Sequence, residues 1–307
     1  MKQDSLSLYK SCRLCGHRCG VDRTRGERGL CNMTSSMRVA RAALHMWEEP
    51  IISGERGSGT VFFSGCSLGC IYCQNKDISR GAGGVEISEE RLSEIFLELE
   101  CQGAHNVNLV TPTHFVPSVI SSVAMARERG LTVPIVYNTS SYETRETITA
   151  LSGTVDVYLA DLKYYKEETA RRLSFADDYC RTAREAIAEM VKNQPIPVIK
   201  DGIMQRGVVV RILLLPGHLI EAKLSLKYLY DTYGDSIYIS LMSQYTPMGE
   251  LPSPLDRTVT EYEYRSLVRY AEELGVTYAF IQEGGSAEES FIPPFDNTGV
   301  LPIGGKN

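Results

Sequence analysis

The chain has 307 residues, a formal net charge of −6 and 43% hydrophobic residues. The net negative charge argues against a nucleic-acid partner, because nucleic-acid binders usually carry a basic stripe. The hydrophobic content suffices for a large core, and the length fits either two domains or one α/β barrel. Since the first residues form no apolar leader and no run approaches about 18 apolar residues, we expect a cytoplasmic protein without a membrane partner.

The first predicted unit is a cysteine-rich lobe over residues 1–36, which contains Cys12, Cys15, Cys19 and Cys31. Clustered cysteines in a long chain without a leader indicate metal rather than disulfides. Four thiolates are a complete ligand set for zinc or for a [4Fe-4S] cluster, and their spacing does not decide between the two. Such a site either relays electrons or binds substrate, or it staples a lobe that has little core of its own, and we favour the staple.

Residues 37–58 predict a strand and a loop that lead into a larger unit. The loop contains the adjacent carboxylates of Glu48 and Glu49, just after His45 and Trp47. Neighbouring side chains on an extended segment point in opposite directions, so we do not expect the two carboxylates to form a catalytic pair.

A second cysteine group, Cys66, Cys70 and Cys73, directly follows an apolar strand predicted over residues 60–64. The spacing C-x3-C-x2-C can hold a [4Fe-4S] cluster by three thiolates and leave the fourth iron without a protein ligand, free to bind and reduce a substrate or cofactor. A zinc knuckle is the alternative, but structural zinc wants four ligands, and no further Cys or His lies near this trio in the sequence.

Strand and helix signals alternate between residues 59 and 283, which predicts an α/β fold with a parallel sheet and helices outside it. Further strands are predicted over 106–110, 134–138, 155–161, 207–215, 236–242 and 276–281. Helices are predicted over 88–103, with Ser88 as N-cap, then 118–130, 142–153, two stretches up to 192, 221–234 and 260–275. The Gly/Pro-rich tail over 284–307 is expected to be irregular and to cover the mouth of the barrel.

Polar side chains follow the predicted strands, where parallel sheets place their ligands. The candidates are Thr111, Thr113 and His114; Asn138, Thr139, Ser140 and Ser141; Asp161 and Lys163; and Gln244 and Tyr245. Lys163 can pair with a ligand carboxylate while Asp161 holds it, or the two form an ordinary surface ion pair. Arg211 lies inside an apolar strand, so it either faces a ligand in the lumen or makes an internal salt bridge.

The cysteine triplet in FFSGCSLGCIYCQN resembles that of radical S-adenosylmethionine (radical SAM) enzymes. GSGTVFFSGC, VYNTSSYE, DLKYY and ISLMSQYTP resemble the branch related to pyruvate formate-lyase activating enzyme. The resemblance implies a partial (β/α)6 TIM-like barrel in which the open iron takes the amino and carboxylate groups of SAM. It further implies that Tyr72 packs near the adenine, that Asp161 and Lys163 contribute to the SAM site, and that small polar groups such as Asn138 bind SAM. This chain lacks the Gly-Gly-Glu-like run that often holds the SAM amino group in the superfamily; Thr111 and Thr113 stand there and are candidates for the same role. Arg211 and Gln244 are candidate contacts to SAM or substrate from their own positions in and after the strands.

The implied activity is reductive cleavage of SAM to a 5′-deoxyadenosyl radical that abstracts hydrogen from a glycyl-radical enzyme, with a flavodoxin or ferredoxin type protein as electron donor. The chain has GERGSGTVFFSG where activases carry a Gly-Pro-Gly-x-Arg-like run, and Cys73-Gln74-Asn75 in place of Cys-His-Asn. These departures and the four-cysteine lobe leave open a radical SAM enzyme that modifies a small molecule or peptide. A non-catalytic metal-stapled binding protein is the alternative from another class.

Overall fold

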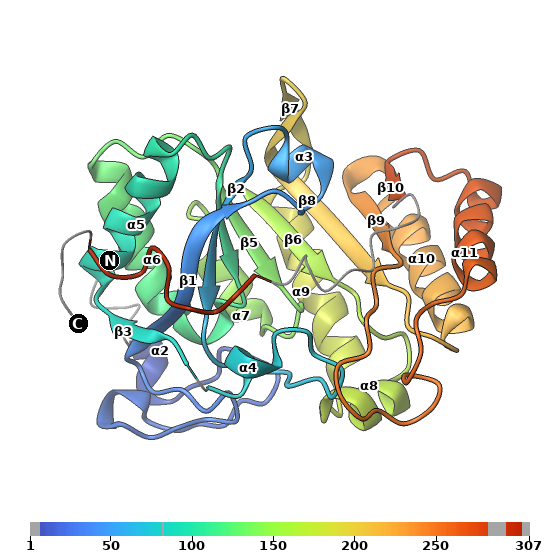
Figure 1. The fold of residues 1–307 in the computed structure, drawn as a ribbon, viewed down its shortest axis with the longest axis horizontal. Helices are drawn as coiled ribbons and strands as arrows, with labels where there is room; N and C mark the ends of the chain where they lie inside the picture. The colour runs from blue at the N-terminus through green and yellow to red at the C-terminus, as the bar shows by residue number, and fades with distance from the viewer. Residues whose placement is uncertain (1–6, 82, 282–292, 303–307) are drawn as a thin grey trace.

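The computed structural model describes residues 7–81, 83–281 and 293–302. Seven of the described strands are parallel. In chain order these are β2 (Ser58–Phe63), β4 (Val107–Val110), β5 (Ile135–Thr139), β6 (Val157–Asp161), β8 (Ile203–Leu213), β9 (Tyr238–Met242) and β10 (Ala279–Ile281). They lie side by side in the order β10-β9-β8-β6-β5-β4-β2 at the centre of the molecule (Figure 1). Every residue of β2, β4 and β5 is buried, as is typical of parallel strands covered on both faces.

Two antiparallel strands extend this sheet beyond β2. They are β1 (Met37–His45), which pairs with β2, and β3 (Val85–Ile87), which pairs with β1. The segment expected to connect the lobe to the barrel therefore contributes a full strand, followed by the short helix α3 (Pro50–Ser53). Within the described residues the sheet is open, with β10 at one edge and β3 at the other.

Helices flank the sheet and alternate with its parallel strands (Figure 1). The longer ones are α5 (Glu89–Cys101), α6 (Val116–Glu128), α7 (Arg145–Ala150), α8 (Glu167–Ser174), α9 (Tyr179–Asn193), α10 (Leu219–Tyr233) and α11 (Glu261–Leu274). The short ones are α2 (Ser7–Lys10), α4 (Lys76–Ser79), η1 (Arg23–Arg25), η2 (Thr113–Phe115) and η3 (Gly234–Ser236). The expected α/β fold with a parallel sheet is confirmed.

Helix α5 shows why the sequence pattern located these elements well. The Ser88 side chain accepts a hydrogen bond from the backbone N–H of Arg91 at 3.1 Å, which caps the first turn. Leu92, Ile95 and Phe96 share one helical face and are buried against the sheet. The predicted cap and apolar face are both confirmed.

A β-hairpin before β8 was not predicted. Strand β7 (Val198–Lys200) pairs antiparallel with the beginning of β8, which starts at Ile203 rather than at the predicted residue 207. Asp201 and Gly202 form the turn, and both have positive φ angles (51° and 76°). Asp-Gly is a favoured pair for two-residue hairpins, but Pro195 and Pro197 obscure the strand signal before it.

The N-terminal lobe shares the main hydrophobic core and does not stand apart from it. Tyr9, Leu14 and Met33 are buried in the same cluster as residues of β2 and β4. In Figure 1 the lobe lies below β1 and close to α4. The part of the chain that the structure describes contains no helix long and apolar enough to cross a membrane.

The described part of the C-terminal tail, residues 293–302, passes across β1 in Figure 1 and hydrogen-bonds to its backbone. The Asn297 amide donates to the Ala40 carbonyl at 2.9 Å, and the Ala42 amide donates to the Thr298 carbonyl at 2.8 Å. Phe295 packs on Phe62 of β2, with ring centroids 5.4 Å apart. The remaining tail positions, for which we expect an irregular cover, lie outside the described residues.

Candidate active site

A cavity of about 260 Å³ lies at the carboxyl ends of the parallel strands. This edge collects the residues that follow each strand, because parallel strands all end on the same side of the sheet. Of the site residues predicted from the sequence, Cys66, Cys70, Cys73, Tyr72, Thr111, Asn138, Asp161, Lys163, Arg211 and Gln244 line the cavity. Side chains from segments that are far apart in the sequence thus meet in one place.

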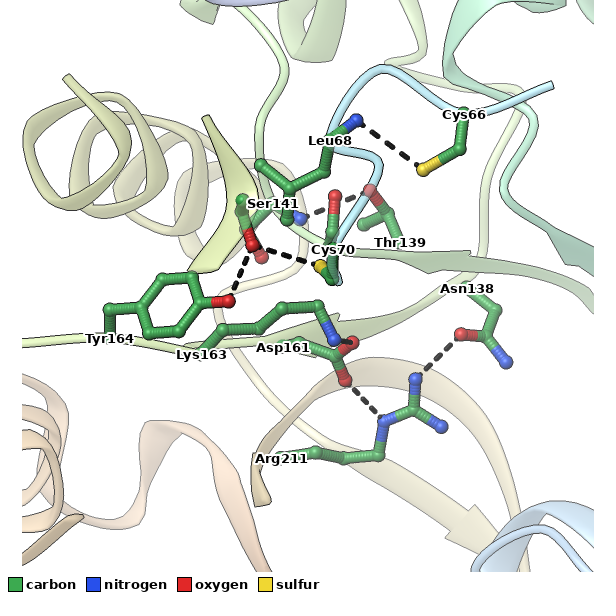
Figure 2. A network of polar contacts seen from close by, with 12 residues as sticks. Cys66, Leu68, Cys70, Asn138, Thr139, Ser141, Asp161, Lys163, Tyr164 and Arg211 are labelled. Carbon is green, nitrogen blue, oxygen red and sulfur yellow. Dashed lines mark hydrogen bonds and ion pairs between the residues drawn. The ribbon is translucent and has the colours of Figure 1, made fainter. Parts of the chain in front are cut away.

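The three cysteines lie on the loop that follows β2, and Figure 2 shows two of them, Cys66 and Cys70. The Leu68 amide donates to Cys66 Sγ at 3.3 Å, and the Ser174 hydroxyl donates to Cys70 Sγ at 3.0 Å. Burial raises the pKa of the Cys66 thiol to about 12, and the nearby thiols of Cys73 and Cys70 raise it further. Such a thiol loses its proton only to a strong competitor such as a metal, whose binding releases protons.

A polar network crosses the cavity next to these cysteines (Figure 2). Arg211 Nε donates to Asp161 Oδ1 at 2.7 Å, and Arg211 Nη2 donates to Asn138 Oδ1 at 2.7 Å. Asp161 Oδ2 accepts from Lys163 Nζ, also at 2.7 Å, and Arg211 Nη1 lies 3.3 Å from Glu48 Oε2. The sequence left open whether Arg211 faces the lumen or forms an internal salt bridge. In the structure it does both.

The network is mostly buried, so Asp161 and Lys163 do not form an ordinary surface pair. Their side chains are 16% and 17% exposed. Burial by itself would raise the pKa of Asp161, but the charges of Arg211 and Lys163 outweigh it and hold that pKa below its usual value. Burial raises the pKa of Glu48 against the opposing charge of Arg211, and it raises the pKa of Glu49 to about 7. The electrostatics favour a charged Asp161 beside two less acidic carboxyl groups.

Glu48 belongs to the site, which the sequence did not indicate. The Asn108 side chain donates to Glu48 Oε1 at 3.1 Å, and the Asn138 side chain donates to the same atom at 3.3 Å. The available signal was Arg211, since a guanidinium inside an apolar strand requires a carboxylate partner. The strand-end candidates Thr139, Ser140 and Tyr245 also line the cavity. Further lining residues that were not among the candidates are His45, Trp47, Gln74, Asn75 and Pro293.

Thr113 and His114 point away from the cavity. The Thr113 hydroxyl donates to Glu143, a buried carboxylate, because η2 turns the chain immediately after Thr111. His114 Nε2 lies 2.7 Å from the Ser64 carbonyl, and burial lowers its pKa to about 3. Thr113 is therefore not placed to contact a ligand in the cavity, contrary to the expectation from the strand end.

Tyr72 and Gln244 line the cavity, and contacts with neighbouring residues hold both in place. The Tyr72 hydroxyl lies 2.8 Å from that of Tyr164, and its ring lies 6.0 Å from the ring of Tyr245. Gln74, which stands where activases carry histidine, donates from Nε2 to the Gln244 carbonyl at 3.2 Å. This contact ties the cysteine loop to the segment after β9.

Comparison with known proteins identifies the class. A family model described as the radical SAM superfamily matches residues 60–226, more than half of the chain. The chain belongs to this superfamily, whose members are enzymes that use a [4Fe-4S] cluster and SAM.

The chain is also similar to individual proteins. It is 29% identical over 279 residues to the uncharacterized protein MJ0674 of Methanocaldococcus jannaschii. The match covers 87% of this chain and 76% of that protein. HydG, a maturase of the [FeFe]-hydrogenase, matches with a TM-score of 0.50 and 14% identity over 70% of this chain and 48% of its own. Methylornithine synthase (PylB) matches with a TM-score of 0.49 and 18% identity, covering 67% and 58%. The chain thus spans about half the length of these solved structures. The likeness to HydG is one of fold, in accord with the predicted partial barrel.

The residues of the cavity fit the cofactors of the superfamily. Three thiols face one space, two of them accept hydrogen bonds at sulfur, and polar groups for a charged ligand lie beside them. Cys66, Cys70 and Cys73 are therefore the residues suited to hold the cluster. Cys12, Cys15, Cys19 and Cys31 are absent from the cavity lining and form a separate group.

Proposed function

We propose that this protein cleaves SAM reductively at a cluster held by Cys66, Cys70 and Cys73 and abstracts hydrogen from a substrate. When bound, the reduced cluster supplies the electron that splits SAM into methionine and a 5′-deoxyadenosyl radical. The observation that carries the proposal is the convergence of this cysteine triplet with the Asp161–Lys163–Arg211 network in one cavity. Open iron–sulfur sites of this kind bind a ligand at the cluster, whereas four-cysteine sites mainly pass electrons.

Lys163 and Asn138 are suited to orient the charged end of SAM. Lys163 is fixed by its ion pair with Asp161, so its ammonium is presented to the cavity at a defined place. A charge-assisted hydrogen bond from it to a carboxylate is stronger than a neutral one. Asn138 is held by Arg211 and keeps its side chain in the lumen. Tyr72, buried next to Cys73, offers an aromatic surface for the adenine.

Apolar side chains line the rest of the cavity and would exclude water from a reactive intermediate. They are Phe62, Leu68, Val110, Leu213 and Met242. Removing water suppresses side reactions and strengthens electrostatic contacts inside the site. The protein thereby supplies orientation and dryness, while the cofactors supply the radical chemistry.

For the substrate we propose a glycyl-radical enzyme, on the resemblance to activating enzymes. A small molecule or peptide is the second candidate. It is favoured by Gln74, which occupies the cavity wall where activases carry histidine and which is engaged with Gln244. We further propose a flavodoxin or ferredoxin type protein as electron donor, because the cluster needs a low-potential electron, and a cytoplasmic location.

The test is anaerobic reconstitution of the full chain with iron and sulfide, followed by a SAM-cleavage assay with a chemical reductant. We expect 5′-deoxyadenosine from the wild-type protein and none from the Cys66→Ala/Cys70→Ala/Cys73→Ala variant, which should also lose the spectrum of this cluster. Cys101→Ser is the matched control, since Cys101 is exposed at the end of α5. Undiminished cleavage by the triple variant would contradict the proposal.

The substrate is tested in the same assay. Hydrogen transfer from a deuterated candidate into 5′-deoxyadenosine identifies the substrate that is attacked. A glycyl radical detected on an added protein by electron paramagnetic resonance supports the activase function, and label transfer only from a small molecule or peptide supports the alternative.

A further inference from the structure

A second group of thiols lies outside the active-site cavity, in the N-terminal lobe. The backbone brings Cys12 and Cys19 together: the Cys12 amide donates to the Val21 carbonyl at 3.0 Å, and the Gly20 amide donates to the Cys12 carbonyl at 2.9 Å. Cys19 Sγ and Cys31 Sγ both lie beside Gly29. The backbone thus brings Cys12, Cys19 and Cys31 into one small region of the lobe, and Cys15 lies between Cys12 and Cys19 in the chain.

Gly29 marks the centre of this group. A Cβ atom on Gly29 would lie 2.8 Å from Cys19 Sγ and 3.8 Å from Cys31 Sγ. The first distance is too short for a carbon and a sulfur atom, so a side chain here would displace the Cys19 sulfur. The absence of a side chain at this position keeps the space between two of the thiols open.

Backbone amides are already directed at two of the sulfur atoms. The His17 backbone hydrogen-bonds to the Cys15 thiol, and the Met33 backbone hydrogen-bonds to the Cys31 thiol. Donors of this kind favour the thiolate over the thiol, and they surround metal-bound ligands in general. The lobe thus has the outer shell of a thiolate site.

Arg23 supplies an independent observation, because it is a fully buried cation without a carboxylate. Its Nε donates to the Met33 carbonyl at 3.1 Å, and its other nitrogens donate to the carbonyls of His114 and Thr34. Its guanidinium lies 5.0 Å from the centre of the Tyr9 ring. Among the described residues, no Asp or Glu lies within ion-pair distance of it, yet a buried charge is costly unless it is compensated.

The charge that can compensate Arg23 comes from the thiols. Arg23 donates to the carbonyl of Met33, two residues after Cys31, so the guanidinium lies next to the segment that carries this thiol. Four neutral thiols would leave the guanidinium uncompensated, whereas four thiolates around a zinc ion or an iron–sulfur cluster carry a net negative charge. The buried arginine is therefore explained by an anionic centre and not by a set of free thiols.

We propose that Cys12, Cys15, Cys19 and Cys31 hold a second metal centre, and that Arg23 is its buried counter-cation. The ligand is a thiophilic metal, as a zinc ion or as an iron–sulfur cluster, and binding releases the thiol protons to solvent. Among the described residues no three Cys, His, Asp or Glu side chains lie close enough together to bind one ion directly, so the thiol side chains must rotate to close on the metal.

The centre is tested in the full-length Cys66→Ala/Cys70→Ala/Cys73→Ala variant, which lacks the other site. We expect about one zinc ion per chain, or iron and sulfide in equal amounts, by metal and sulfide analysis. Adding Cys12→Ser and Cys31→Ser should remove this metal, and adding Cys101→Ser should not. The proposal is overturned if the triple variant binds neither zinc nor iron and sulfide on reconstitution, and if its four N-terminal thiols react freely with a thiol reagent while the chain is folded.

The role of Arg23 is tested by Arg23→Met, with Arg25→Met as control because the Arg25 side chain is 82% exposed. Loss of the counter-cation should weaken metal binding about 10- to 100-fold in a chelator competition, the range for residues behind the ligands. In a chain whose four cysteines are replaced by serine, Arg23→Met should destabilise less than in the metal-loaded chain. Equal destabilisation in both backgrounds would mean that Arg23 only holds backbone carbonyls, and would overturn its assignment.

Discussion

Lys163 shows how a single residue gains its proposed role from its partner. Its ammonium is held 2.7 Å from Asp161, and Asp161 is itself held by Arg211. Burial by itself would lower the pKa of Lys163, but the charge of Asp161 outweighs it, so the pKa is raised and the ammonium stays charged. A rigid, charged donor beside the cysteines is what recognition of a carboxylate requires.

Replacing Lys163 by alanine should therefore weaken SAM binding by about 1.5–3 kcal/mol, the scale of a hydrogen bond to a charged group. Isothermal titration of the reconstituted protein with SAM measures the loss. The iron and sulfide content should stay normal, because Lys163 is not among the predicted ligands. Lys166→Ala is the matched control, since Lys166 is exposed three residues further on. Unchanged affinity in Lys163→Ala would reject the role, and loss of the cluster would indicate a structural one.

At the scale of one element, helix α11 is fixed by a capping box. The Thr260 side chain accepts from the Glu263 amide at 3.2 Å, and the Glu263 carboxylate accepts from the Thr260 amide at 2.9 Å. Glu263 also accepts from both terminal nitrogens of Arg257 and from the Gly217 amide before α10. One carboxylate thus joins the start of α11 to the segment that precedes α10.

Glu263→Gln should lower the free energy of unfolding by about 1–3 kcal/mol at neutral pH, because the five groups that donate to this carboxylate lose a charged acceptor. The hydrogen bonds from Arg257, Thr260 and Gly217 hold the pKa of Glu263 below its usual value. Its contribution is therefore complete above the unfolded pKa of about 4.3 and is lost as the pH falls through the lower folded value.

Urea denaturation of both proteins across this pH range measures the difference. Glu261→Gln is the control, since the Glu261 side chain is 76% exposed on the same first turn. A wild-type advantage that stays constant down to acid pH would show that the charge of Glu263 is not what stabilises the cap.

Across the whole molecule, the two ends of the chain meet at β1. The lobe before β1 packs into the main core, and the described tail pairs with the backbone of β1. Asp296 adds an ion pair to Arg41 at 2.9 Å, and Pro293 reaches the cavity wall. The cavity wall therefore contains both Glu48 and Pro293, which lie far apart in the sequence. The hydrogen bond between Arg41 and the Pro294 carbonyl, at a separation of 253 residues, joins the same two segments.

Gly299 is the position at which a substitution should most disturb the contact between the tail and β1. It has a φ angle of +71°, and a Cβ atom there would lie 2.0 Å from the Ala42 carbonyl oxygen. Gly299→Ala should therefore separate the tail from β1. Gly153→Ala is the matched control, because Gly153 has a φ angle of +76° with nothing within 4 Å of the added Cβ, so it carries only the backbone cost of about 1–2 kcal/mol.

Limited proteolysis measures the effect. We expect faster cleavage of the tail in Gly299→Ala than in the wild type and in Gly153→Ala, at a temperature where all three are folded. Equal cleavage of the two variants would show that the tail tolerates the contact by a small shift.

Residue patterns along the chain predicted the strand–helix alternation and located the cysteine triplet and most of the polar residues at the strand ends. Each of these signals is local, because it depends on only a few neighbouring residues. Examples are the periodic spacing of apolar residues, the N-cap Ser88 and the spacing of Cys66 and Cys70. The convergence of these polar residues could also be predicted from the sequence, because the carboxyl ends of parallel strands lie at the same edge of the sheet.

The side chains that complete the site are brought there by contacts between distant segments, which are seen only in the folded chain. Glu48 precedes the barrel in the sequence, but it reaches Arg211 across 163 residues, and Thr113 leaves the cavity because η2 turns it toward Glu143. The lobe likewise joined the main core, and Arg23 became a buried cation there, through contacts with residues as distant as His114. Such placements depend on packing between segments that are far apart in the chain, and no local pattern of residue types records which distant partner satisfies a buried charge.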